Sequence, residues 1–269
     1  MDQRGIKIAV AQPFCVPGDI NGNLARMEEL LLPLVERGAQ LALFSEAGVT
    51  GYRADAPRVR ANDPTWRKLS QMAARTGCAV VAGFVEASET GNHITQGCFH
   101  PGGQVDIQRK HRVAAVEEAM EDFVAGPFER TVFSVGGVRC AIAICADFGG
   151  EALWQHLLDA GVELLLLPTA ACGTRSLGYS LSALDDPAIF ETYLEREAGL
   201  YFSAGAVRDT RRTGIALATC NQLAIHGDYF HPGHSMVVSA AGQVLALLPG
   251  TLVFEFLHPR ADCVILPIK

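Results

Sequence analysis

The run Val138-Arg139-Cys140-Ala141-Ile142-Ala143-Ile144-Cys145-Ala146-Asp147-Phe148-Gly149-Gly150 joins an apolar stretch to a cysteine, a short polar segment and two glycines. This pattern predicts a buried strand that ends at Cys145 and a helix that follows from about Glu151 to Ala160. A helix after such a corner points backbone N–H groups and partial positive charge at the preceding residues. We therefore expect a lowered thiol pKa and a nucleophilic sulfur at Cys145. The alternative is a buried structural cysteine that packs as a small hydrophobic residue.

Strand and helix patterns alternate on either side of this run. A helix capped by Asn23 should end near Gly38, and Asp63-Pro64 should open a second one. A third helix is expected at Asp186–Glu197, and extended chain at Tyr201–Val207. Buried strands are expected at Ile6–Ala11, Leu41–Phe44, Ala79–Val85 and Leu164–Leu167.

Two hairpins are expected among these elements. One pairs Thr95–His100 with Val105–Arg109 around a Pro-Gly-Gly turn, and the other pairs Ser235–Ser239 with Gln243–Leu248. Early βαβ units combined with hairpins indicate an α/β (α+β) fold in which helices cover mixed sheets. No linker or low-complexity stretch divides the sequence, so residues 1–269 are expected to form a single domain.

Composition limits the classes of function. The chain has 269 residues, of which 49% are hydrophobic and 19% charged, and its net charge is −7. An acidic chain of this kind argues against nucleic acid or a membrane surface as a partner. The eight cysteines are scattered without a Cys-x-x-Cys pair, and no signal peptide is recognised at the N-terminus, so a reduced, cytoplasmic protein is expected.

Two charged residues stand at strand ends as Cys145 does. Glu46 follows the apolar run Leu41–Phe44, where partial burial would raise its pKa toward values that suit a general base. Lys110 ends the second strand of the first hairpin. A carboxylate, an ammonium and a thiol brought together could remove the thiol proton and stabilise an oxyanion, with the N–H of Ala146 as a further donor. The alternatives are a solvated loop glutamate and a basic surface turn.

The order of these motifs resembles the nitrilase superfamily of carbon–nitrogen hydrolases. The resemblance rests on Ser45-Glu46-Ala47-Gly48-Val49-Thr50-Gly51-Tyr52, Arg109-Lys110-His111-Arg112 and Ile144-Cys145-Ala146-Asp147-Phe148. It extends over nearly the whole chain, through Ile8–Gln12, Leu165–Thr169, His231–Ser235 and Gly242–Leu245. It implies a four-layer α-β-β-α sandwich, a homodimer or higher homo-oligomer, and no metal or organic cofactor.

The resemblance also implies roles for individual residues. Cys145 would be the nucleophile, Glu46 the general base and Lys110 the stabiliser of the tetrahedral intermediate. A second glutamate after the lysine is expected to position the substrate or the lysine. Glu118 is the first choice for it, with Glu117 and Glu121 as alternatives, although all three could form a solvated acidic face. Tyr52, Ala146, Phe148 and Thr169 are expected to bind substrate, with core packing as the alternative for Tyr52, Phe148 and Thr169.

The implied reaction is hydrolysis of a small amide or carbamoyl compound through a thioester. The Cys-Trp-Glu sequence typical of nitrile-cleaving members is absent, which favours amides over nitriles. The alternatives are an acyltransferase or ammonia-donating partner that uses the same thioester, and a binding protein that has lost turnover. His226, His231 and His234 match no common ligand spacing, so no metal site is expected.

Overall fold

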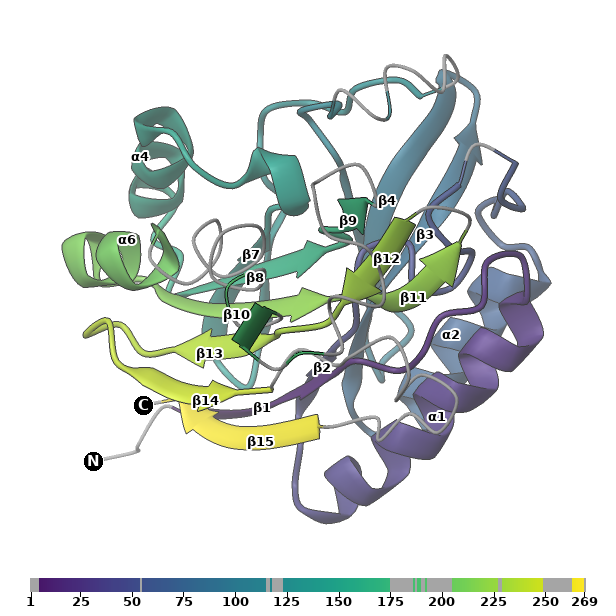
Figure 1. Ribbon diagram of the computed structural model, residues 1–269. Helices are drawn as coiled ribbons and strands as arrows, with labels where there is room; N and C mark the ends of the chain where they lie inside the picture. Colours follow the sequence, from purple (N-terminus) through teal and green to yellow (C-terminus); the bar gives the residue numbers. More distant parts are fainter. Residues whose placement is uncertain are drawn as a thin grey trace.

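The computed structural model describes residues 5–53, 55–114, 117, 123–174, 186, 188–189, 192, 205–226, 229–248 and 263–268. Two six-stranded sheets pack against each other, and helices lie on their outer faces (Figure 1). The first sheet has the order β15(Cys263–Ile268), β1(Ile6–Ala11), β2(Leu41–Leu43), β3(Ala79–Ser88), β4(Gly91–Phe99), β5(Val105–Arg109). The second has the order β14(Val244–Leu247), β13(Met236–Val238), β10(Ala216–Asn221), β8(Leu164–Thr169), β7(Val138–Ile142), β6(Val132–Val135).

Both sheets are mixed in the same way. Strands β1, β2 and β3 are parallel in the first sheet, as are β7, β8 and β10 in the second, and antiparallel strands flank each trio. Every residue of β2, β8 and β10 is buried, as expected for parallel strands that are covered on both faces. A small third sheet is formed by β11(Leu223–His226), β12(Tyr229–Pro232) and β9(Gly173–Thr174).

Strand β8 shows how the layers are built. Its side chains alternate between the two faces of the sheet, so Leu164 and Leu166 enter the core between the two sheets. Leu165 and Leu167 face the opposite way and pack with helices α4(Glu151–Asp159) and α6(Gly205–Thr213). A third cluster packs α1(Ile20–Glu36) and α2(Pro64–Thr76) against the first sheet. The expected α-β-β-α sandwich is confirmed.

The first helix begins earlier than expected. Asp19 is its N-cap, and the Asp19 carboxylate accepts a hydrogen bond from Gly22 N at 3.0 Å. Asn23 instead lies inside the helix with its side chain buried, and its Nδ2 donates to the carbonyl oxygens of Val16 and Val49. Asn23 therefore anchors a neighbouring loop and does not cap the helix.

The extended chain predicted at Tyr201–Val207 is wrong at its described end. Gly205–Val207 form the first residues of α6, whose buried positions Ala206, Asp209 and Thr210 have helical spacing. The arginines and β-branched residues on the rest of this helix hide its periodicity in the sequence. The helix predicted at Asp186–Glu197 lies for the most part outside the described residues.

Both predicted hairpins form, since β4 pairs with β5 and β13 pairs with β14. No helix in the described ranges is both long and apolar enough to cross a lipid bilayer.

Candidate active site

Glu46 lies on a turn directly after β2, and its side chain is fully buried. The turn crosses β3 so closely that a Cβ atom on Gly83 would lie 2.5 Å from Ala47 N and 2.7 Å from Ser45 O. Glycine at position 83 thus allows the turn to sit against the strand. Gln222 Nε2 donates to the backbone oxygen of Glu46 at 3.3 Å and anchors the turn from the other sheet.

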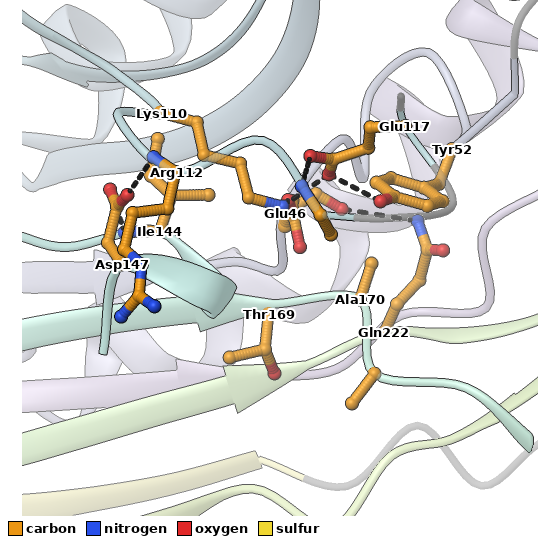
Figure 2. A network of polar contacts seen from close by, with 12 residues as sticks. Glu46, Tyr52, Lys110, Arg112, Glu117, Ile144, Asp147, Thr169, Ala170 and Gln222 are labelled. Atoms are coloured by element: carbon orange, nitrogen blue, oxygen red, sulfur yellow. Dashed lines mark hydrogen bonds and ion pairs between the residues drawn. The ribbon is translucent and has the colours of Figure 1, made fainter. Parts of the chain in front are cut away.

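Lys110 follows β5, and two backbone hydrogen bonds hold it in place. Its N–H donates to Ile94 O at 2.8 Å, and Gly126 N donates to Lys110 O at 2.6 Å. The side chain is 3% exposed, and Nζ lies 2.7 Å from Glu46 Oε1. The same Nζ donates to Glu117 Oε1 (Figure 2). One buried ammonium group therefore joins two carboxylates.

Cys145 begins a short 3-10 turn, Cys145–Asp147, that follows β7. Its φ angle is 45°, a left-handed conformation that a residue with a side chain adopts only at a cost. The residue is partly exposed, whereas the strand before it is buried. The Cys145 thiol lies close enough to Glu46, Lys110 and the backbone of Ala170 for all three to shift its pKa, and Glu46 Oε2 is buried without a hydrogen-bond partner in the described part of the chain. The structure thus places Glu46, Lys110 and Cys145 in one cluster.

The second glutamate beside the lysine is Glu117, which the sequence offers as an alternative to Glu118. Glu118 and Glu121 lie outside the described residues. Glu117 is 1% exposed, and its Oε1 accepts from both Lys110 and the Tyr52 hydroxyl. Its Oε2 accepts a hydrogen bond from Ala114 N at 2.6 Å.

The electrostatics of the resting site differ from the expectation for the cysteine. Burial and the nearby Glu46 carboxylate raise the pKa of the Cys145 thiol, and Lys110 offsets only part of this effect. The expected lowered thiol pKa is therefore wrong. Helix α4 begins only at Glu151, so the turn after Cys145 is too short to supply a full helix N-terminus.

The two charged partners have shifted pKa values as well. Burial raises the pKa of Glu46, and Glu117 adds to this effect, while Lys110 opposes it. Burial acts to lower the pKa of Lys110, but the negative groups around it outweigh burial and raise that pKa. A protonated thiol thus faces a carboxylate with increased proton affinity, beside an ammonium group that stays charged.

The remaining predicted pocket residues differ in their surroundings. Tyr52 is buried beside Lys110, whose Nζ lies 5.7 Å from the centroid of the tyrosine ring. Ala146 is partly exposed within the Cys145 turn. The Thr169 hydroxyl donates to Asn221 Oδ1 at 2.9 Å. Phe148 packs edge-on against Trp154 under the outer helices, a placement that favours packing for this residue.

Two residues near the site, Gln222 and Ala170, are missing from the sequence-based set. Gln222 is fully buried, and its Oε1 has no hydrogen-bond partner in the part of the chain that the structure describes. Ala170 contacts the Cys145 sulfur, and its carbonyl oxygen accepts from Nδ1 of the buried His231 at 3.1 Å. The sequence does contain a signal for Gln222. This residue directly follows the buried strand β10 (Ala216–Asn221), much as Glu46 follows β2.

Comparison with known proteins agrees with this geometry. The sequence profile described as carbon-nitrogen hydrolase matches residues 7–184. Among curated relatives, the glutamine-dependent NAD(+) synthetase of Thermotoga maritima is 24% identical over 89% of this chain. A hydrolase of Pseudomonas protegens is 26% identical over 61% of it. The chain spans 39% of the length of the first and 59% of the second.

Two solved structures share the fold. An amidase from Nesterenkonia sp. superposes with a TM-score of 0.75 at 24% identity, covering 100% of this chain and 92% of that one. A CN-hydrolase superfamily protein from Xanthomonas campestris, with an arsenic adduct in its active site, gives a TM-score of 0.76 at 16% identity, covering 98% and 91%. At these identities the structures establish the fold, whereas the profile match covers more than half of the sequence. This chain therefore belongs to the carbon–nitrogen hydrolase family.

Proposed function

We propose that the protein hydrolyses the carbon–nitrogen bond of a small amide or carbamoyl compound through a thioester on Cys145. The observation that carries this proposal is the buried Lys110 ammonium, which contacts Glu46 and Glu117, with the Cys145 thiol close enough to Lys110 and Glu46 for both to shift its pKa. A base, a cation and a nucleophile within contact of one another form the arrangement that acyl transfer needs.

In the first half of the reaction, Glu46 takes the thiol proton as the sulfur attacks the carbonyl carbon. A C–S bond forms, and negative charge develops on the carbonyl oxygen. Lys110 Nζ and the N–H of Ala146 are the proposed donors to this oxygen. The tetrahedral intermediate collapses as Glu46 returns the proton to the leaving nitrogen, which departs as ammonia or an amine and leaves the thioester.

In the second half, Glu46 removes a proton from water, and the resulting hydroxide adds to the thioester carbonyl. The C–S bond breaks, the thiolate regains the proton from Glu46, and the acid is released. Glu117 has no proton to transfer in this scheme. Its hydrogen bonds from Tyr52 and Ala114 fix its carboxylate, which in turn holds Lys110 toward Glu46.

Intact-mass spectrometry with a substrate panel tests this proposal. Acrylamide and butyramide suit the panel, because structures of the related Nesterenkonia amidase contain them. A carbamoyl compound and glutamine complete it. We expect a mass increase equal to the acyl group on Cys145, followed by release of free acid and ammonia. A Cys145→Ala variant that turns over the same substrate at the normal rate would rule out the thioester.

A second candidate is an ammonia-supplying partner for another enzyme. It is favoured by the alignment of 89% of the chain with a glutamine-dependent NAD(+) synthetase of which it spans only 39%. Glutamine should then be the best substrate in the panel, and ammonia should be released along with glutamate. Transfer of the acyl group to an added amine would instead indicate an acyltransferase.

We also propose that the protein forms a homo-oligomer, as the family resemblance implies, and that it is cytoplasmic, as its scattered cysteines indicate. Light scattering on the purified protein tests the assembly, and a mass equal to one chain at micromolar concentration would contradict it.

A further inference from the structure

Asp147 is a buried carboxylate that lies two residues after the nucleophile and outside the set of reacting groups. It is 2% exposed. Its Oδ1 accepts hydrogen bonds from His111 N at 3.0 Å and from Arg112 N at 2.8 Å. These two N–H groups belong to the residues that directly follow Lys110, so Asp147 holds the chain at the point where the catalytic lysine leaves β5.

The other oxygen of Asp147 holds the segment that carries the thiol. Oδ2 accepts from Ile144 N, directly before Cys145, at 3.1 Å, and closes the 3-10 turn (Figure 2). Asp147 therefore caps the turn that contains Cys145, whereas the next helix, α4, begins after Gly150. One carboxylate thus fastens the lysine segment of the first sheet to the cysteine turn of the second.

Arg130 compensates the charge of Asp147. Its Nη2 lies 3.7 Å from Asp147 Oδ2, and its side chain is 1% exposed. Arg130 Nη1 also donates to the carbonyl oxygens of Pro127 and Phe128, at 3.2 and 2.7 Å. Arg130 is thus buried against the backbone and Asp147. We therefore assign the pair a structural role beside the site, not a role in substrate binding.

We propose that Asp147 is a positioning residue, which fixes the distance between Lys110 and the Cys145 sulfur and maintains the left-handed backbone of Cys145. This inference rests on the proposed function, because the distance between Lys110 and the Cys145 sulfur matters for catalysis only if both groups take part in it. Cys145 adopts its φ of 45° against an intrinsic preference, so its turn needs external hydrogen bonds to persist. Misplacement of a reacting group by about 1 Å can cost roughly 100-fold in rate.

The test compares Asp147→Asn with a double variant, Asp147→Asn/Arg130→Met. The carboxamide keeps the size of Asp147 but cannot accept all three backbone N–H groups. Since the single variant leaves Arg130 buried without its counter-charge, it could fail to fold, and the double variant removes that charge as well. Asp209→Asn is the matched control, because Asp209 is also buried, ion-paired to arginine and bonded to Trp154 Nε1, but lies on α6.

Four quantities are measured for each folded variant: kcat and KM on the best amide, the melting temperature, and the rate at which iodoacetamide alkylates Cys145, read from peptide masses. We expect both Asp147 variants to lose about 100-fold in kcat with KM within twofold, and at least tenfold in alkylation rate. The Asp209 control should melt lower yet keep its alkylation rate and kcat within about twofold.

Wild-type alkylation and kcat in a folded Asp147 variant would overturn the proposal, as would equal losses in the Asp209 control. The alkylation rate separates this inference from the proposed function. If the wild-type protein hydrolyses no amide, yet alkylation falls in the Asp147 variants alone, the hydrolase assignment fails and the positioning role stands.

Discussion

Replacing Glu46 by glutamine should abolish turnover and also stabilise the folded protein at neutral pH. The side chains of Glu46, Glu117 and Lys110 are 0%, 1% and 3% exposed, so two carboxylates share one ammonium in a dry site. Burial and Glu117 raise the pKa of Glu46 despite its contact with Lys110. The charged form of Glu46 therefore lowers the stability of the folded protein. Glutamine resembles the neutral form and avoids this loss of stability.

The magnitude follows from the charge count of this cluster. Two negative groups and one positive group leave one buried negative charge in excess, whereas Glu46→Gln leaves the Lys110–Glu117 pair balanced. Substitutions that remove a destabilising feature of this kind from an active site commonly add about 0.5–2 kcal/mol to the free energy of unfolding. For a chain of this size, that corresponds to a melting temperature roughly 1–4 °C higher.

The gain should depend on pH in a defined direction. The folded chain binds a proton at Glu46 more tightly than the unfolded chain does, for which the ordinary pKa is 4.5. The stability that Glu46 contributes is thus fully present below about pH 4.5 and is lost as pH rises through its folded pKa. Melting curves of wild type and Glu46→Gln should coincide near pH 4 and separate progressively toward pH 8.

Glu86→Gln is the matched control, with the opposite expected sign. Glu86 is also buried, but Arg109 Nε and Nη2 each donate to its carboxylate at 2.8 Å, and Thr95 donates at 2.8 Å. Burial acts to raise the pKa of Glu86, yet these hydrogen bonds outweigh burial and lower it. Glu86→Gln should therefore lose about 1–3 kcal/mol at pH 7, with the loss shrinking as the pH falls below about 4.5.

The assay is calorimetric melting at half-unit steps from pH 4 to pH 8, together with turnover of the best amide at pH 7. A Glu46→Gln protein that melts below wild type throughout this range would refute the reasoning. A constant stability gain at every pH would do so too, because the gain must then arise from something other than a buried charge.

Three further substitutions test other parts of the site. Lys110→Met leaves two buried carboxylates without their cation, so it should lose roughly 3–5 kcal/mol at pH 7 and less at pH 5, by urea unfolding. Its acylation should slow by at least about 100-fold, and unchanged acylation would remove Lys110 from the mechanism. Cys145→Ala should melt close to wild type and retain bound substrate without product, by native mass spectrometry; normal product release would exclude covalent catalysis there. Gln222→Leu removes a buried carboxamide whose Oε1 has no partner in the described part of the chain, so kcat/KM should fall about tenfold more for an amide than for the matched ester. Equal losses for both substrates would show that Gln222 supports only the Glu46 backbone.

The three central residues of the site could be located from the sequence because each one follows a predicted strand, apolar for Glu46 and Cys145 and part of a hairpin for Lys110. Glu46 follows β2, Lys110 follows β5 and Cys145 follows shortly after β7. Strand ends gather at the edges of a sheet, so apolar runs and the polar residues after them already indicate a shared site. Helices that cover the sheets could be predicted from fully apolar runs such as Leu164–Leu167, which must be covered on both faces, whereas the stacking of two sheets was implied by the family resemblance.

The second glutamate could not be located in this way. Three glutamates lie close together at positions 117, 118 and 121, and no strand or helix period in the sequence distinguishes them. Glu117 is distinguished by contacts with Tyr52, 65 positions away, and with Lys110 across the same loop. The pairing of β15 with β1 is hidden for a similar reason, since it joins the two ends of the chain. Contacts of this kind exist only after the sheets have packed.

The protonation state of the nucleophile is the least accessible property from sequence, because burial and several charges with opposing effects decide it. The motif suggests a positive surrounding for Cys145, and Lys110 does act to lower the pKa of the thiol. However, Lys110 already contacts two carboxylates, and Glu46 together with burial outweighs it. A thiol that stays protonated at rest is also protected from oxidation and stray electrophiles, which react with the thiolate. The Cys145 thiolate would then form only when the carbonyl oxygen of a substrate lies against Lys110 and interacts with its positive charge. The thiol proton moves to Glu46 in the same step. In that case the alkylation rate of Cys145 by a neutral reagent should be slow relative to acylation by a true substrate, and a ratio near one would contradict substrate-dependent activation.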